Sequence, residues 1–258
     1  MTQRRPNFAD LTIRQKLILS GLYLSKFDSL GLKSLGLDNF VEAFNVIGYA
    51  LGSRPASVKN YRDEFDPLFP NPRKGWHKRP TREYCREVYE KYKGLDLAEF
   101  TGLVRSFFGF DNNLQIEAAQ TEESGEGSSA FAQRLVTGLA AERYFESVCA
   151  SLPVFQGLLL GNTTQFGCGY DFRMRPEPNR EDFLAIEVKG LKDQSGSLSM
   201  TPKEYAAASE LKERFFLFVV RNFREAPNHT IFQNPISSAL QFKKKETVIV
   251  QISWSTTV

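Results

Sequence analysis

The stretch FLAIEVKGLK (183–192) places a glutamate and a lysine inside a segment whose other residues are typical of a buried β-strand. Side chains of a strand alternate between its two faces. Glu187 and Lys189 are therefore predicted to share one face, and the aliphatic Leu184, Ile186 and Val188 the other. A charged pair in this position is either a simple ion pair or part of a catalytic site. Other segments of the sequence are needed to distinguish these two interpretations.

A second acidic residue lies in a preceding segment, CGYDFRMR (168–175), which also has the composition of a short strand. The residues between the two segments, PEPNRED (176–182), are rich in turn formers. A hairpin with its centre near residue 179 sets Asp171 opposite Glu187. Two carboxylates held close together repel each other, and a divalent cation relieves that repulsion; hard oxygen ligands in small number are what magnesium prefers. The alternative is that Asp171 begins a turn and Lys189 only neutralises Glu187.

The surrounding segments predict a mixed α/β fold with a central sheet. Thr201 to Glu204 have the pattern of a helix start, with Thr201 as the cap, Pro202 in the first turn and Glu204 closing a capping box. The predicted elements are a long helix over 131–152, strands over 154–163, 168–175 and 182–189, a helix over 204–213, a buried strand over 215–223 and a last strand over 246–254.

The spacing GYD, fifteen residues, then E-V-K resembles the motif of the PD-(D/E)XK nucleases, with Tyr170 where many members have proline. The resemblance covers about residues 130–225 and implies a restriction-endonuclease-like core. It implies that Asp171, Glu187 and the carbonyl of Val188 bind Mg²⁺, with Mn²⁺ as a substitute, and that Lys189 positions the attacking water. Family members often place a glutamate on the preceding helix near the metal; Glu142 is the best match, and Glu146 is the alternative.

Residues 1–116 are predicted to form a mainly helical domain that binds DNA. Helical patterns cover 11–25, 39–51 and 55–65, and two more helices are expected within 81–109. The second and third are separated by Gly52 and Ser53, with Ser53 as a candidate N-cap; this is the outline of a helix-turn-helix. Residues 72–93 carry eight basic and three acidic residues, which suits a phosphate backbone or, alternatively, a solvated helix face. The candidate DNA-binding residues are Arg54, Lys59, Asn60, Arg62, Arg73, Lys74, Lys78 and Arg79.

A segment rich in Glu, Ser and Gly, residues 117–130, is predicted to be a linker or mobile loop, which leaves 131–258 as the nuclease domain. The three cysteines form no Cys-x-x-Cys pair, and there is neither a signal peptide nor a membrane-spanning run, so a cytoplasmic location is expected. Two histidines are too few for an HNH or H-E-x-x-H site, and the sequence has no phosphate-binding P-loop and no G-x-S-x-G motif.

The sequence therefore predicts a magnesium-dependent endonuclease that hydrolyses double-stranded DNA, with a type II restriction endonuclease as the expected role. Cutting both strands favours a homodimer, and a restriction system also includes a companion DNA methyltransferase. Two alternatives remain. One is a non-catalytic DNA-binding or specificity subunit that keeps the nuclease fold, and the other is a structure-specific repair nuclease.

Overall fold

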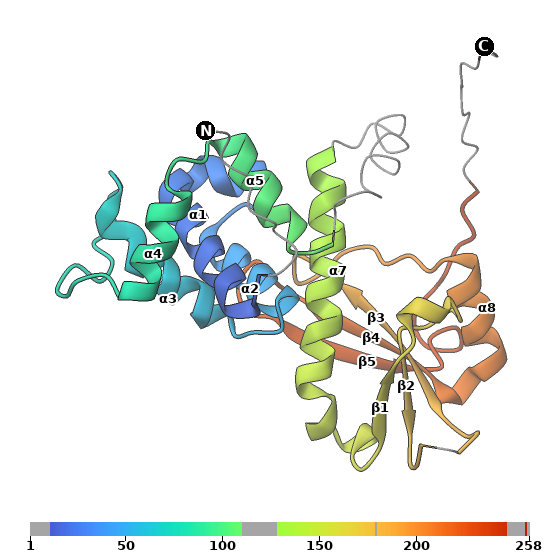
Figure 1. Ribbon diagram of the computed structural model, residues 1–258. Helices are drawn as coiled ribbons and strands as arrows, with labels where there is room; N and C mark the ends of the chain where they lie inside the picture. Colours follow the sequence, from blue (N-terminus) through green and yellow to red (C-terminus); the bar gives the residue numbers. More distant parts are fainter. Residues whose placement is uncertain (1–10, 110–127, 179, 247–255, 257–258) are drawn as a thin grey trace.

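The computed structural model describes residues 11–109, 128–178, 180–246 and 256 (Figure 1). Its centre is a five-stranded mixed sheet in the order β1-β2-β3-β4-β5, in which β3 and β4 run parallel and the other neighbours are antiparallel. The strands are β1 (Leu159–Asn162), β2 (Phe172–Arg175), β3 (Leu184–Gly190), β4 (Phe215–Arg221) and β5 (Asn228–Gln233). The protein thus has an α+β fold.

Helices make up most of the N-terminal half. They are α1 (Ile13–Ser34), α2 (Phe40–Ala50), α3 (Pro55–Phe65), α4 (Glu83–Tyr92) and α5 (Leu97–Ser106), with a short 3₁₀ helix, η2 (Asp66–Leu68). Two more helices accompany the sheet: α7 (Ser128–Val148) and α8 (Pro202–Leu211). Four further 3₁₀ turns in the described part of the chain are η3 (Cys149–Ser151), η4 (Pro153–Phe155), η5 (Thr164–Phe166) and η6 (Lys212–Arg214).

Helix α7 lies between the N-terminal helices and the sheet (Figure 1), and it packs against α2 on one side and against β3 and β4 on the other. Its fully buried Phe145 makes ring contacts with Phe155, Phe172 and Phe218. Every second residue of β2 and β3 joins this core because strand side chains alternate. One hydrophobic core therefore extends from the N-terminal helices into the sheet.

The opposite face of the sheet carries α8. A smaller apolar cluster, which includes Ala185, Ala208 and Phe215, joins this helix to β3 and β4. Thr201 caps α8 and forms a reciprocal capping box with Glu204, and Pro202 occupies the first turn, as the sequence predicts. The cap fixes where α8 begins, and with it the position of Glu204 over the sheet.

Polar contacts also join the N-terminal helices to the sheet region. Asn45 of α2 is buried and donates hydrogen bonds to the carbonyls of Phe223 and Glu225. Glu42, fully buried on the same helix, accepts a hydrogen bond from Gln133 of α7 and lies 3.7 Å from the ammonium of Lys192. The domain boundary near residue 116 stays a prediction.

Most predicted elements are confirmed, with several corrections. Ser53 is not the N-cap of α3; Arg54 takes that position without a side-chain cap bond, and Pro55 begins the helix. The first strand is shorter than 154–163, because Pro153–Phe155 forms a 3₁₀ turn. Strand β5 was not predicted, since its sequence NHTIFQ is mostly polar and lies between prolines.

Two predicted segments fall wholly or largely outside the described residues. The strand expected over 246–254 lies there except for its first residue. Residues 117–127 of the expected linker also lie outside the described residues. Its last three residues, 128–130, belong to α7, which begins at Ser128. Within the described ranges, no helix is long and apolar enough to cross a membrane.

Candidate metal-dependent active site

Asp171 and Glu187 meet where β2 begins and β3 approaches its end. The β2–β3 register pairs Phe172 with Ile186, so that one step further Asp171 lies opposite Glu187. This is the arrangement expected from a hairpin centred on residue 179. The backbone N–H of Asp171 bonds to the carbonyl of Ile186 at 3.0 Å, and the Oδ2 atom of Asp171 accepts a hydrogen bond from the N–H of Val188 at 2.8 Å. These bonds fix the carboxylate of Asp171 against β3.

Lys189 lies between two carboxylates. Its ammonium is 2.6 Å from Oε1 of Glu187 and 2.8 Å from Oε2 of Glu204. Burial opposes the charge of Lys189, but the two contacts outweigh it and raise the pKa of the ammonium. Lys189 is therefore held as a cation in a fixed position at the end of β3.

Glu204 is a member of the candidate site that sequence reasoning missed. The pattern T-P-K-E identified it as the partner in a helix cap, and it does accept a hydrogen bond from the N–H of Thr201 at 2.9 Å. The same oxygen also accepts from Lys189. Because α8 crosses from β3 to β4, only the tertiary fold brings this cap beside the lysine. A clue in the sequence was that the capping box follows the lysine within the same crossover.

Glu142 approaches this cluster from α7. Burial, together with the negative charge of Asp171, raises the pKa of Glu142 to about 7. Within the described part of the chain, no group forms a hydrogen bond or ion pair with its carboxylate. The alternative residue, Glu146, forms an ion pair with Arg143 at 2.6 Å. Of the two glutamates on α7, Glu142 is thus the one that shares the electrostatic environment of Asp171.

The ionised forms of the carboxylates at this site are disfavoured by burial and by mutual repulsion. Burial raises the pKa of Asp171. Burial and the charge of Asp171 raise the pKa of Glu187 to about 9, while the ammonium of Lys189 opposes that rise. Glu187 is 3% exposed, so water does little to offset the repulsion. An added cation would relieve it.

These residues fit a hard divalent cation. Asp171 and Glu187 supply carboxylate oxygens, which are the ligands that Mg²⁺ uses, and Mg²⁺ commonly takes only one or two of them from a protein. The third expected ligand is the main-chain carbonyl of Val188. The described residues contain no group of three or more His, Cys, Asp or Glu that could hold a metal ion, so a site here would take only two carboxylates from the protein.

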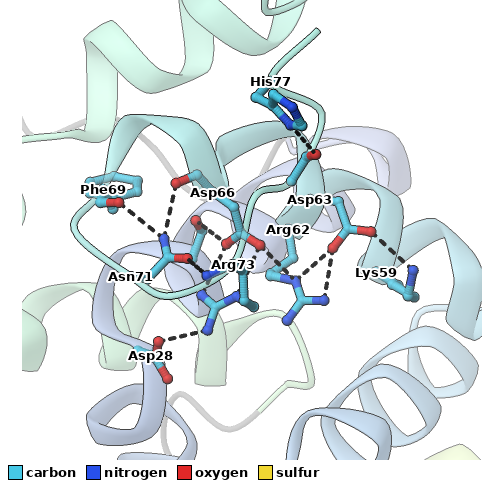
Figure 2. A network of polar contacts seen from close by, with 11 residues as sticks. Asp28, Lys59, Arg62, Asp63, Asp66, Phe69, Asn71, Arg73 and His77 are labelled. Atoms are coloured by element: carbon cyan, nitrogen blue, oxygen red, sulfur yellow. Dashed lines mark hydrogen bonds and ion pairs between the residues drawn. The ribbon is translucent and has the colours of Figure 1, made fainter.

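Several candidate DNA-binding residues of the N-terminal half have structural partners instead (Figure 2). Arg73 binds the buried Asp66 and also Asp28, and Arg62, itself 8% exposed, bridges Asp63 and Asp66. These ion pairs anchor the loop after α3 to the helices. The pairing of Arg73 with Asp28 spans 45 positions and could not be read from the sequence, whereas Arg62 pairs with acidic residues one and four positions further along the chain.

The other candidates divide into two groups. Arg79 binds the buried carboxylate of Glu64, and Lys59 pairs with Asp63. Four candidates are exposed and form no ion pair among the described residues: Arg54, Asn60, Lys74 and Lys78. The basic stretch 72–93 is thus partly a structural element and partly a solvent-facing surface.

Comparison with known proteins gives one match. Residues 154–232 match the family described as Protein NO VEIN, C-terminal. The match includes Asp171, Glu187, Lys189 and Glu204 and covers less than a third of the chain. No curated protein and no solved structure matches the chain.

Proposed function

We propose that this protein is a magnesium-dependent endonuclease with a restriction-endonuclease-like core, which hydrolyses phosphodiester bonds in duplex DNA. The observation that carries the proposal is the convergence of Asp171, Glu187 and Lys189 at one end of β2 and β3, in the order and spacing of the PD-(D/E)XK motif. The unpartnered Glu142 beside them adds a further carboxylate to the site.

Asp171 and Glu187, with the carbonyl of Val188, would hold the cation. A bound Mg²⁺ supplies Lewis-acid stabilisation of the phosphoryl oxygen and lowers the pKa of bound water. Lys189 orients the attacking water and balances the negative charge that develops on the phosphate. The water oxygen forms a bond to phosphorus as the bond to the leaving sugar oxygen breaks. The water's proton passes to solvent or to a carboxylate such as Glu142, and the leaving oxygen takes up a proton from solvent.

The crossover helix has a supporting part in this scheme. Glu204 gives the ammonium of Lys189 a second carboxylate contact besides the one with Glu187, which restrains it from leaving the site. Because the ammonium is already held in position, it needs little reorientation to stabilise the negative charge that develops on the phosphate. Through Glu204, the capped start of α8 thereby positions the ammonium of Lys189, which would otherwise be at the end of a flexible side chain.

The substrate assignment rests on the N-terminal helices. Their exposed Arg54, Asn60, Lys74 and Lys78 are suited to contact a DNA backbone or base edges. A type II restriction endonuclease that cuts a defined sequence as a homodimer, beside a companion methyltransferase, combines such a module with this active site. A structure-specific repair nuclease shares the chemistry and differs in substrate.

One observation favours a second candidate, a non-catalytic DNA-binding or specificity subunit. Lys189 already forms ion pairs with both Glu187 and Glu204 in the described structure. A nuclease fold that had lost its metal could keep such a pair for stability alone. The two candidates differ in whether the protein cuts DNA at all, and in whether that cleavage depends on Asp171, which the lysine does not contact.

Digestion of DNA tests the proposal. Modified and unmodified plasmid and phage DNA are incubated with Mg²⁺ or Mn²⁺ and the wild-type protein, Asp171→Ala, Lys189→Ala, or Lys33→Ala as a matched control on the exposed end of α1. Discrete fragments from wild type and Lys33→Ala, absent with both site variants, support a site-specific endonuclease. DNA binding without cleavage on any of these substrates would favour the non-catalytic subunit.

A further inference from the structure

An open groove of about 540 Å³ lies over the edge of the sheet formed by β1 and β2. Its lining includes Leu159, Gly161, Phe166, Arg173, Arg175 and Pro178. The side chain of Phe166 is 78% exposed, the highest value among the large exposed hydrophobic residues of the described structure. An aromatic ring left in water beside two arginines calls for an explanation, because a ring contributes to stability mainly when it is buried.

The groove is on the same face of the sheet as the catalytic pair. Phe172 and Met174 point into the core under α7, so Arg173 and Arg175, which alternate with them, point the other way. Arg173 is the register partner of Ala185, and Ala185 packs on the side of α8. The face that carries the arginines therefore continues into the face that carries Glu187 and Lys189.

Phe166 belongs to the turn at the catalytic end of the groove. That turn is tied to the active site, since the N–H of Thr163 bonds to the carbonyl of Asp171 at 2.7 Å and its hydroxyl bonds to the carbonyl of Tyr170 at 3.0 Å. Gly169 in the same turn fits closely against α8, where an added Cβ would lie 2.6 Å from the carbonyl oxygen of Lys203. The ring is thus displayed on a well-anchored turn.

The charge around the ring is positive. Arg173 lies over the ring of Phe183, and its Nε donates to the hydroxyl of Tyr170. The Nε of Arg175 is buried, with no hydrogen-bond partner among the described residues. The exposed Lys203 extends its ammonium toward Gly167, next to Phe166. Arg173 and Arg175 line the groove together with Phe166, and the ammonium of Lys203 lies beside the same turn. Cations near an exposed aromatic ring suit a nucleic-acid strand.

We infer that this groove binds a single-stranded segment of DNA adjacent to the scissile phosphate, with Phe166 stacked on an unpaired base and Arg173, Arg175 and Lys203 near the phosphates. The inference rests on the proposed nuclease function and deepens it. In an intact duplex the faces of the bases are covered by their neighbours, so Phe166 can stack only on a base that is flipped out, terminal or unpaired. The enzyme would accordingly open its substrate locally, or prefer DNA that is already open, beside the site of cleavage.

Binding of short oligonucleotides in EDTA tests this inference apart from catalysis. The probe is a single-stranded DNA with 2-aminopurine at successive positions, whose fluorescence reports stacking. Phe166→Ala is expected to weaken binding about tenfold and to abolish the fluorescence change, because aromatic stacking makes a contribution of this size per base. Phe166→Tyr should restore both, and Leu30→Ala, which alters an exposed apolar residue on α1, should leave both unchanged.

The outcomes separate the two proposals. If wild type cuts DNA with Mg²⁺ but Phe166→Ala binds the strand like Leu30→Ala, the groove assignment is wrong and the nuclease proposal stands. If wild type cuts no DNA, yet the strand binds in a manner that depends on Phe166, the nuclease proposal fails and the groove assignment stands. Absence of strand binding by wild type, or tighter binding of the corresponding RNA with the same dependence on Phe166, would overturn the assignment to DNA.

Discussion

Replacing Glu142 with glutamine should stabilise the metal-free protein at neutral and alkaline pH. Glutamine keeps the shape of the side chain and removes its charge. The pKa of Glu142 is raised from its ordinary value of 4.5 to about 7 by burial and by the charge of Asp171. A raised folded-state pKa means that the stability linked to this group is fully present below pH 4.5 and is lost as the pH rises through 7.

The size of the effect follows from the shift. Each pKa unit corresponds to about 1.4 kcal/mol, so ionisation of Glu142 costs the fold roughly 3 kcal/mol at most. Partial exposure of the side chain screens the charge, and an observed gain of ~1–2 kcal/mol is expected. The gain should be near zero well below pH 4.5, should grow between pH 4.5 and about pH 7, and should level off at higher pH.

Urea denaturation in EDTA, measured at several pH values for wild type and Glu142→Gln, gives the two stability curves. Glu146→Gln is the matched control one turn further along α7; it removes the ion pair with Arg143 and should bring no gain. Added Mg²⁺ should stabilise wild type more than Glu142→Gln, because the bound cation relieves the repulsion that the substitution has already removed. A difference between wild type and Glu142→Gln that does not change with pH would refute the reasoning, as would a variant less stable than wild type at pH 8.

Three further predictions concern the scaffold. Glu64→Gln should reduce stability at neutral pH by ~1–3 kcal/mol. Burial alone would raise the pKa of Glu64, but hydrogen bonds from its two arginine partners outweigh burial and lower the pKa. The stability that Glu64 provides is therefore present above pH 4.5 and is lost as the pH falls. Thermal melts of both proteins between about pH 7 and pH 3 should converge at the acidic end, and a gap that persists there would contradict the sign. Gly190→Ala should cost roughly 1–3 kcal/mol in urea unfolding, because its Cβ would lie 2.7 Å from the carbonyl oxygen of Thr137 on α7; unchanged stability would mean that helix and strand are less closely packed than described. Arg73→Gln should lower the melting temperature, whereas Lys74→Gln should leave it unchanged and reduce the salt dependence of DNA binding; the reverse pattern would restore Arg73 as a DNA contact.

The β2–β3 hairpin, and the side chains that meet on it, could be predicted from the amino-acid sequence. Alternation along 183–189 assigned Glu187 and Lys189 to one face, and the turn formers of 176–182 set the register that brings Asp171 opposite Glu187. The start of α8 could also be predicted from the sequence, because a helix cap depends on residues within one turn of each other. Each of these features is local, so the pattern of neighbouring residues was sufficient.

The tertiary structure decided which distant residues became partners. It brought Glu204 to Lys189 across the crossover from β3, placed Glu142 rather than Glu146 beside Asp171, and paired Arg73 with Asp66 in place of a free basic surface. It also left Phe166 exposed beside the arginines of β2. These contacts depend on how helices pack against a sheet, and composition or periodicity along the chain does not specify that packing.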